Sequence, residues 1–407
     1  MLLAADMVWH FWLAVVLAIS AVAVLGLIIG LYVTKVSSTR YPKSENRDGL
    51  HHMGDAVDWA LAERVATRVS GSEPFASSYH AAGMARDFEE MTARAQVYVE
   101  AETGLTSAAG QARARVVDRN DWVRANLASY QRLLRPVLGR LDELGGGAAG
   151  SLGGKVAAVE LGGLLGWMSS RVLGQYDLLV LEEENPEDQD LVYYVGPNIL
   201  GLEKRHGFPP DEFRLWVALH EVTHRTQFTG VPWLRPYFLG LVTELMGAAE
   251  PDPKRLFAAV GRVADGVRTR KNPLEDGGIV ALFASPEQRE AMDRVGGLMS
   301  LLEGHGDVTM DRAALDQVPS ADRFARALRA RRTNMNLGAK FLQRLIGLEA
   351  KLAQYEQGEL FIEAVEKVGG PALLNRAFED PLNLPTLVEI RDPSLWIARL
   401  GSAATAA

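Results

Sequence analysis

The first forty residues differ sharply from the rest of the chain in their pattern of apolar positions. The run Phe11–Val33 is almost wholly apolar and would span about 35 Å as a helix, enough to cross a hydrocarbon core of about 30 Å. Trp9, Trp12 and Tyr32 lie near its two ends, where aromatic rings favour the membrane interface. The run is too long, and its start too poor in basic residues, for a cleaved signal peptide. We therefore predict a transmembrane anchor at residues 8–36.

The charges that flank this run predict its orientation. Lys35, Arg40 and Lys43 follow the apolar run, and no basic side chain precedes it. Because basic flanks tend to stay in the cytoplasm, we expect a single-pass membrane protein whose main domain is cytoplasmic. Residues 37–53 are polar and predict a linker between the anchor and this domain.

Helical periodicity dominates the main domain, which we place at residues 54–398. Apolar residues recur at intervals of three and four in the stretches 57–66, 80–98, 112–143 and 155–174. A glycine cluster at residues 145–150 separates two of these stretches and predicts a helix end followed by a hinge. We expect a disordered tail at residues 399–407.

A small β element interrupts the helical pattern. Residues 178–181 and 191–195 are short apolar runs joined by an acidic turn, which is typical of two strands and a loop. The second run lies just before the helix with the strongest chemical signal, so we expect it to be an edge strand to which an extended peptide could add. The predicted fold class is mainly α, a multihelical domain with this small β element and one N-terminal transmembrane helix.

Composition limits the chemistry that the chain can perform. The net charge is −8, which argues against the basic surfaces of nucleic-acid-binding proteins, and we expect no nucleic-acid partner. The absence of cysteine excludes disulfides, thiolate metal ligands and a thiol nucleophile. A transition-metal site would therefore consist of carboxylates and some of the eight histidines.

The segment from His220 to His224 has the sequence His-Glu-Val-Thr-His. The run Pro209-Pro210-Asp211-Glu212 is a helix-start signal, and Gly230 with Pro232 stops the helix about five turns later. Four residues apart, the two imidazoles lie one helical turn apart on one face and can bind one metal ion. Glu221 points to the side of this pair, where it can hold and deprotonate a water molecule without being a ligand.

A catalytic zinc ion needs a third protein ligand and one position left for water. We favour Glu303, which lies in a polar cluster on an apolar helix. His305 and Asp307 share this cluster and are alternative ligands. We prefer to interpret them as residues that contact the ligand groups and so fix the tautomer of a ligand imidazole. Glu244, twenty residues after His224, is a further alternative.

The segment His-Glu-Val-Thr-His-Arg-Thr-Gln-Phe, followed by Val231-Pro232-Trp233, resembles the second group of zincin-like metallopeptidases. This mainly actinobacterial family often carries a label for deazaflavin-coenzyme biosynthesis. The motif Leu302-Glu303-Gly304-His305 and the segment 351–358 are also similar to it. The resemblance implies a mostly helical zincin-like fold, with His220 and His224 as zinc ligands and Glu221 as the catalytic carboxylate.

We therefore expect a zinc-dependent metallopeptidase that binds one Zn²⁺ and acts on a peptide or protein substrate, with Glu221 as general base. The Tyr355 hydroxyl is a candidate donor to the developing oxyanion. Two alternatives remain open. The chain could be a catalytically silent, metal-stabilised scaffold with a closed site of His220, His224, Glu303 and His305, or an amidase that acts on small molecules.

Overall fold

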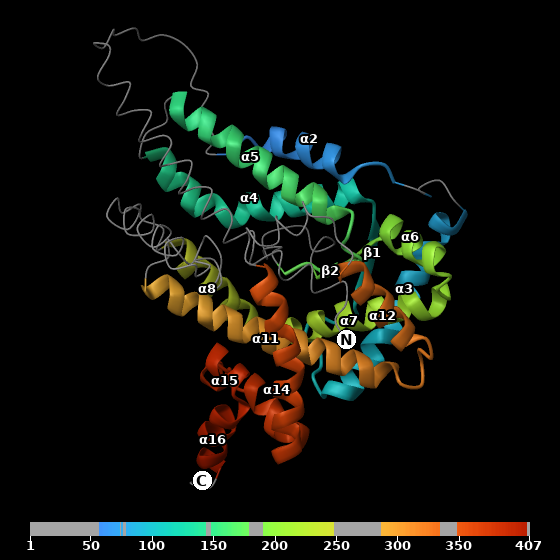
Figure 1. Cartoon of the computed structure of the whole chain (residues 1–407), viewed down its shortest axis with the longest axis vertical. Coiled ribbons are helices and arrows are strands. Elements are labelled where there is room, and N and C mark those ends of the chain that lie inside the picture. The colour runs from blue at the N-terminus through green and yellow to red at the C-terminus, as the bar shows by residue number, and fades with distance from the viewer. Residues whose placement is uncertain are drawn as a thin grey trace.

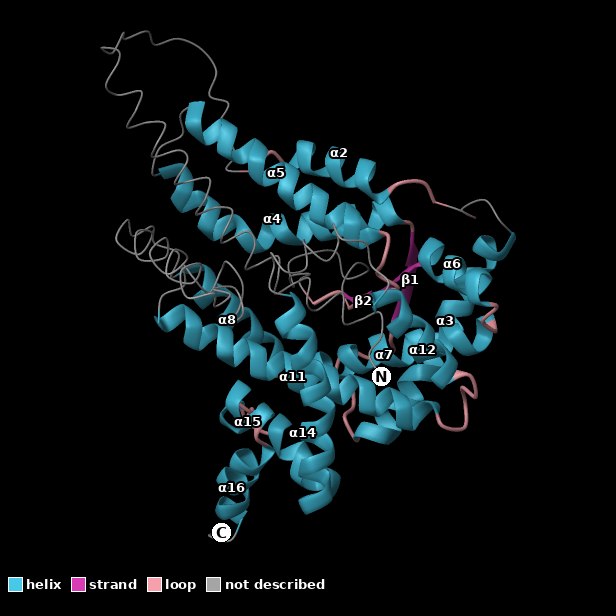
Figure 2. Cartoon of the chain, viewed as in Figure 1, coloured by secondary structure: helices cyan, strands magenta, loops and turns pink. Residues whose placement is uncertain are grey.

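Helices make up most of the chain, and a small sheet lies among them (Figures 1 and 2). The computed structural model describes residues 57–73, 75, 79–143, 148–178, 190–247, 286–333 and 348–404. Within these residues the prediction of a mainly α protein with a small β element is confirmed.

The longer helices follow the predicted periodic stretches. In chain order the helices are α2 (Trp59–Ser70), α3 (Tyr79–Thr103), α4 (Arg119–Glu143), α5 (Ala148–Ser169), α6 (Gly196–His206), α7 (Pro210–Gly230), α8 (Leu234–Gly247), α11 (Pro286–Ala314), α12 (Ala321–Thr333), α14 (Leu348–Asn375), α15 (Leu387–Arg391) and α16 (Pro393–Ala404). Two 3-10 turns, η2 (Arg376–Phe378) and η3 (Pro381–Asn383), connect α14 to α15. α4 ends at Glu143 and α5 begins at Ala148, and residues 144–147, which include most of the predicted glycine hinge, lie outside the described residues.

The helices form three groups along the long axis of the molecule. At one end α2 packs along α5 and α4, and at the other end lie α14, α15 and α16 (Figure 1). Between them α7 packs against α3 on one side and α11 on another, while α11 also contacts α14. This arrangement makes α7 and α11 the central helices of the fold.

The sheet has the strand order β1-β3-β2. β1 (Arg113–Val117) pairs with β3 (Leu191–Val195) in parallel, and β2 (Gly174–Tyr176) pairs with β3 in antiparallel orientation. All five residues of β3 are buried, as is usual for a strand covered on both faces.

Two sequence predictions about this sheet are wrong, and a third falls largely outside the described residues. β3 has its predicted bounds but is the central strand, so it cannot be the edge that accepts an extended peptide. The described strand that precedes β3 lies at Gly174–Tyr176, which the pattern did not predict, and residues 179–181 of the predicted first strand lie outside the described residues. β1 occupies the start of a stretch that we predicted as helical. Its pairing partner lies far along the chain, and local periodicity does not report such a contact.

Helix α7 is buried around its whole circumference. Pro209 precedes it in an extended conformation, Asp211 and Glu212 lie in its first turn near the positive end of the helix dipole, and the helix ends at Gly230. Every residue from Phe213 to Phe228 is buried. A helix that carries two histidines and a glutamate through such a core must satisfy these polar groups internally.

The predicted anchor at residues 8–36 and the linker at 37–53 lie outside the described residues. No helix in the described part of the chain is both long enough and apolar enough to cross a bilayer. The long helices there are interrupted by charged side chains, and the predicted single-pass membrane localisation is therefore corrected: it has no support in this structure.

The tail boundary at residue 399 is also wrong. α16 continues to Ala404, Leu400 is buried, and Arg399 donates hydrogen bonds to Glu389. These contacts extend the folded region past the predicted boundary.

Candidate metal centre

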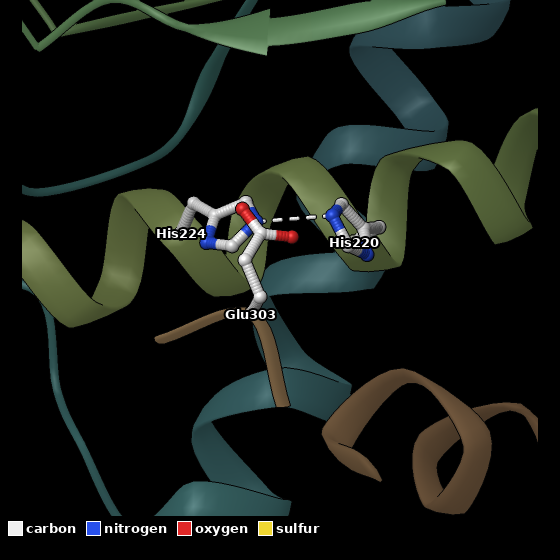
Figure 3. A group of neighbouring side chains, drawn as sticks. All are labelled: His220, His224 and Glu303. Atoms are coloured by element: carbon white, nitrogen blue, oxygen red, sulfur yellow. Dashed lines mark hydrogen bonds and ion pairs between the residues drawn. The ribbon is translucent and has the colours of Figure 1, made fainter. Parts of the chain in front are cut away.

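The two histidines of α7 aim their Nε2 atoms at each other. These atoms are 3.0 Å apart, and the ring planes meet at 80° (Figure 3). Both side chains are buried. Burial lowers the pKa of His224 to about 4, and burial together with the neighbouring imidazole lowers the pKa of His220 well below its usual value. Both rings are therefore neutral at physiological pH, the state in which imidazole binds metals.

Glu303 reaches this pair from α11. Its Oε1 atom lies 3.7 Å from Nε2 of His224, and its side chain is fully buried. One candidate ligand atom from each of the three residues lies within 4.8 Å of the other two, and Figure 3 shows the carboxylate beside the two rings. Gly306 permits this approach of α11, because a Cβ there would lie only 3.2 Å from Cε1 of His224.

The protonation of the imidazoles shows that these residues fit a cation. Oε1 of Gln227, which can only accept a hydrogen bond, lies 3.0 Å from Nδ1 of His224, so the proton of this ring is on Nδ1. Oδ1 of Asp307 lies 3.6 Å from Nδ1 of His220 and favours a proton on that nitrogen. Two Nε2 lone pairs then face each other across 3.0 Å beside a carboxylate. This arrangement is repulsive by itself, and a cation between the groups relieves the repulsion.

The donor set also indicates which cation fits. Two imidazole nitrogens and one carboxylate oxygen form a ligand set typical of catalytic zinc. Magnesium and calcium prefer sites made of oxygen ligands only. The residues present therefore fit zinc better than either of these ions.

Glu221 lies on the side of α7 that faces β2. A Cβ on Gly174 would lie 2.5 Å from Cγ of Glu221, and the backbone N–H of Tyr176 donates a hydrogen bond to the Glu221 carboxylate. Burial raises the pKa of Glu221 to about 8, against the lowering effect of this hydrogen bond. The carboxyl group can therefore gain or lose a proton near neutral pH.

The alternative third ligands lie away from the two imidazoles. Glu244 is exposed on α8 and forms an ion pair of 2.6 Å with Arg294. Nδ1 of His305 lies 3.0 Å from Nε2 of Gln227, and its ring packs against Phe378. Neither residue belongs to the group of side chains that could hold the metal in the described part of the chain.

The two predicted partners of the ligands are placed differently. Asp307 is buried beside Nδ1 of His220, the nitrogen that points away from Nε2 of His224. His305 contacts Gln227 and so reaches a ligand imidazole only through this amide. Tyr355 lies in the first part of α14, outside the residues whose side chains the structure describes, so its role stays a prediction.

Comparison with known proteins identifies the relatives of this chain. The sequence model of a family described as zincin-like metallopeptidase matches residues 57–397. The chain belongs to the zincin-like metallopeptidase family. This result confirms the resemblance that the motifs indicated. The family implies a zinc ion, and His220, His224 and Glu303 form a possible site for it.

A solved structure is similar over most of the chain. It is described as a "putative hydrolase with a novel fold" from Chloroflexus aurantiacus. The two chains share 30% sequence identity and a TM-score of 0.63, and the match covers 85% of this chain and 99% of the other. No curated protein matches the sequence. The family and the solved structure together support a hydrolase.

Sequence reasoning missed three residues that shape the site, namely Gln227, Gly306 and Gly174. Gln227 could have been found, because a residue three positions after His224 on the same buried helix lies near its ring. Gly306 also lies within the recognised polar cluster. Gly174 had no local signal, because its contact with Glu221 depends on how β2 packs against α7.

Proposed function

We propose that this protein is a zinc-dependent metallopeptidase. One observation carries the proposal: the group formed by His220, His224 and Glu303 supplies three ligands, and the described residues place no fourth histidine or carboxylate in it. Three protein ligands with one remaining position are typical of catalytic zinc sites, whereas structural sites use four.

The position of His305 argues against the scaffold alternative. A closed site would use this histidine as the fourth ligand. Instead, its Nδ1 atom accepts a hydrogen bond from Gln227 and its ring packs against Phe378. A position for water therefore remains, which a catalytically silent scaffold would not need.

The proposed chemistry follows from the residues around the metal. His220, His224 and Glu303 would hold the zinc ion, which when bound would supply a positive charge that polarises a water molecule and the carbonyl group of a substrate. Glu221 accepts a proton from the water as its oxygen forms the new bond to the carbonyl carbon. The same carboxyl group then donates a proton to the leaving nitrogen as the C–N bond breaks. Burial of Glu221 suits both steps, because it brings the pKa of this group closer to neutral pH.

A peptide bond is the substrate that we propose, in agreement with the family. The test compares the full-length wild-type protein with Glu221→Gln on an unstructured protein such as casein. We expect cleavage by the wild type and a loss of about 10²–10⁴-fold in the variant, because the amide cannot transfer the proton. The zinc content of both proteins should be equal, since Glu221 is not in the ligand group.

Glu244→Gln is the matched control, because it makes the same change at an exposed carboxylate on α8. This variant should keep full activity. Equal cleavage by wild type and Glu221→Gln would contradict the proposed mechanism. Zinc binding without cleavage of any protein, combined with hydrolysis of small amides, would indicate the amidase alternative.

A further inference from the structure

Gln227 connects the two central helices at the metal centre. Its side chain projects from α7, and its Nε2 atom donates a hydrogen bond of 2.9 Å to the backbone carbonyl of Leu302 in α11. The same Nε2 lies 3.0 Å from Nδ1 of His305, and Oε1 lies 3.0 Å from Nδ1 of His224. Gln227 is fully buried, and the mechanism proposed above gives it no role.

These contacts determine which way the amide of Gln227 points. The carbonyl oxygen of Leu302 can only accept a hydrogen bond, so the nitrogen of the amide must face it. His305 is held next to the same nitrogen and accepts through Nδ1, which places the proton of its ring on Nε2. With its nitrogen on this side, Gln227 must turn Oε1 toward His224. The amide therefore has one favourable orientation.

The orientation of the amide determines which ring nitrogen of His224 carries the proton. An acceptor beside Nδ1 keeps the proton on that nitrogen and leaves Nε2 free to bind a metal. The hydrogen bond to the Leu302 carbonyl also holds the backbone of α11 beside α7 next to Glu303, because Leu302 directly precedes Glu303. A single side chain thus contacts one proposed ligand and the residue next to another, across two helices that lie far apart in sequence.

We propose that Gln227 is a positioning residue that selects the metal-binding tautomer of His224 and holds α11 so that Glu303 reaches the same ion. The proposal rests on the proposed function for the identity of the ion. Its first consequence holds in the metal-free protein: His224 carries its proton on Nδ1, and His305 carries its proton on Nε2.

The experiment uses full-length protein with ¹⁵N-labelled histidine. Long-range proton–nitrogen correlation spectra of the metal-free form report the tautomer of each ring, and zinc affinity is measured by competition with a chromophoric chelator. Gln227→Met keeps the length of the side chain but removes its hydrogen-bonding groups. We expect a mixture of His224 tautomers in this variant and zinc binding about 10–100-fold weaker than in the wild type.

Gln227→Glu separates the two contacts. Its carboxylate still accepts from Nδ1 of His224, so the tautomer should be retained, but it has no hydrogen to donate to Leu302. Asn126→Leu is the control, because it removes another buried amide, one that pairs with Gln175. This variant should change neither the tautomer of His224 nor the affinity for zinc.

Three results would overturn the proposal. The first is a wild-type His224 with its proton on Nε2, which needs no variant and is independent of folding effects. The second is a pure Nδ1–H tautomer in folded Gln227→Met, and the third is a zinc affinity of that variant within about twofold of the wild type. Expected tautomers in a protein that cleaves no peptide would instead contradict the proposed function alone.

Discussion

At the scale of single residues, two acidic side chains near the same helix have different environments. Glu303 is fully buried near the two imidazole nitrogens, within reach of a shared ion. Glu221 is buried against β2, where a backbone N–H holds it outside that group. In the proposed function, Glu303 binds the metal and Glu221 moves protons. The difference comes from the direction of each side chain, because both residues are buried.

Glu303→Gln should greatly weaken zinc binding. The substitution keeps the shape of the side chain but replaces a negatively charged ligand with a neutral amide. We expect a loss larger than the roughly 10–100-fold that is typical for partners of metal ligands, measured by chelator competition. Glu244→Gln, at the exposed carboxylate that pairs with Arg294, should bind zinc as the wild type does. Loss of affinity in the second variant and not in the first would mean that the third ligand is misassigned.

Gly306→Ala tests how closely α11 must approach the imidazoles. Its Cβ would lie 3.2 Å from Cε1 of His224, a ring that Gln227 holds in place. We expect zinc affinity to fall about tenfold as the ring is displaced. The control is Gly240→Ala in α8, where a Cβ would meet nothing within 4 Å. Unchanged affinity in Gly306→Ala would show that the ring can move without loss of binding.

At the scale of elements, the crossing of α11 and α14 depends on small residues. A Cβ on Gly358 would lie 2.2 Å from the backbone oxygen of Ser300, and one on Gly304 would lie 2.5 Å from the backbone of Gly358. Backbone atoms cannot move aside as a flexible side chain can. The helix that carries Glu303 is therefore supported by a close backbone contact with α14.

Gly358→Ala should destabilise the protein by about 1–3 kcal/mol through overpacking at this crossing. The measurement is urea unfolding of the full-length protein. Gly240→Ala has the same gain in helix propensity without the clash and should be stabilising by up to about 1 kcal/mol. If both variants gained stability, the two helices would not be in such close contact.

The C-terminal helices contain a pH-dependent contact. Thr386 and Glu389 form a capping box at the start of α15, and Arg399 of α16 donates to the Glu389 carboxylate. Burial acts to raise the pKa of Glu389, but the hydrogen bonds from Arg399 and Thr386 outweigh it and lower the pKa. Because the pKa is lower in the folded state, this contact stabilises the fold above the unfolded pKa of about 4.5 and is lost as pH falls.

Glu389→Gln should therefore lower the Tm at pH 7 and have a smaller effect at an acidic pH well below the unfolded pKa of about 4.5, where the wild-type carboxyl group gains a proton. Thermal unfolding of both proteins at the two pH values measures this difference. If the difference in Tm between the wild type and Glu389→Gln were equal at both pH values, the charge of Glu389 would contribute nothing to stability.

At the scale of the whole molecule, the proposed metal ion would join segments that are distant in sequence. His220 and His224 belong to α7, and Glu303 belongs to α11, with residues 248–285 between α8 and α11 outside the described part. A cation bound by all three residues would contribute its binding free energy to folding, because the unfolded chain does not hold these groups together.

Zinc should therefore raise the Tm of the full-length protein, and a chelator should lower it. At a free zinc concentration of about 1,000 times the Kd, the expected stabilisation is about 4 kcal/mol. Scanning calorimetry with and without zinc measures this shift. In Glu303→Gln, most of this zinc-dependent increase in Tm should be lost. An equal shift in the variant would place the bound zinc elsewhere.

Parts of the fold and of the site followed from local sequence. Helix α7 has the predicted bounds, because proline at its start and glycine at its end act on the adjacent backbone. The pairing of His220 with His224 follows from the helical repeat alone. Glu303 was selected from several candidates because polar groups on an apolar helix need partners, and the structure brings it to the two imidazoles.

Other features depended on contacts between distant segments. β1 pairs with β3 across more than seventy residues, and this pairing makes β3 a central strand where local pattern suggested an edge. Glu244 likewise lies outside the candidate metal group because it forms an ion pair with Arg294, a contact between α8 and α11 that local sequence does not report.

Sequence alone thus determined the helical class, the helix of the candidate site and its two imidazoles, since these depend on residues within a few turns of one another. Only the tertiary structure decided the strand order, which candidate third ligand lies beside the imidazoles and the orientation of Gln227. Each of these is set by groups that meet across helices or strands, where packing, and not the local repeat, selects the partner.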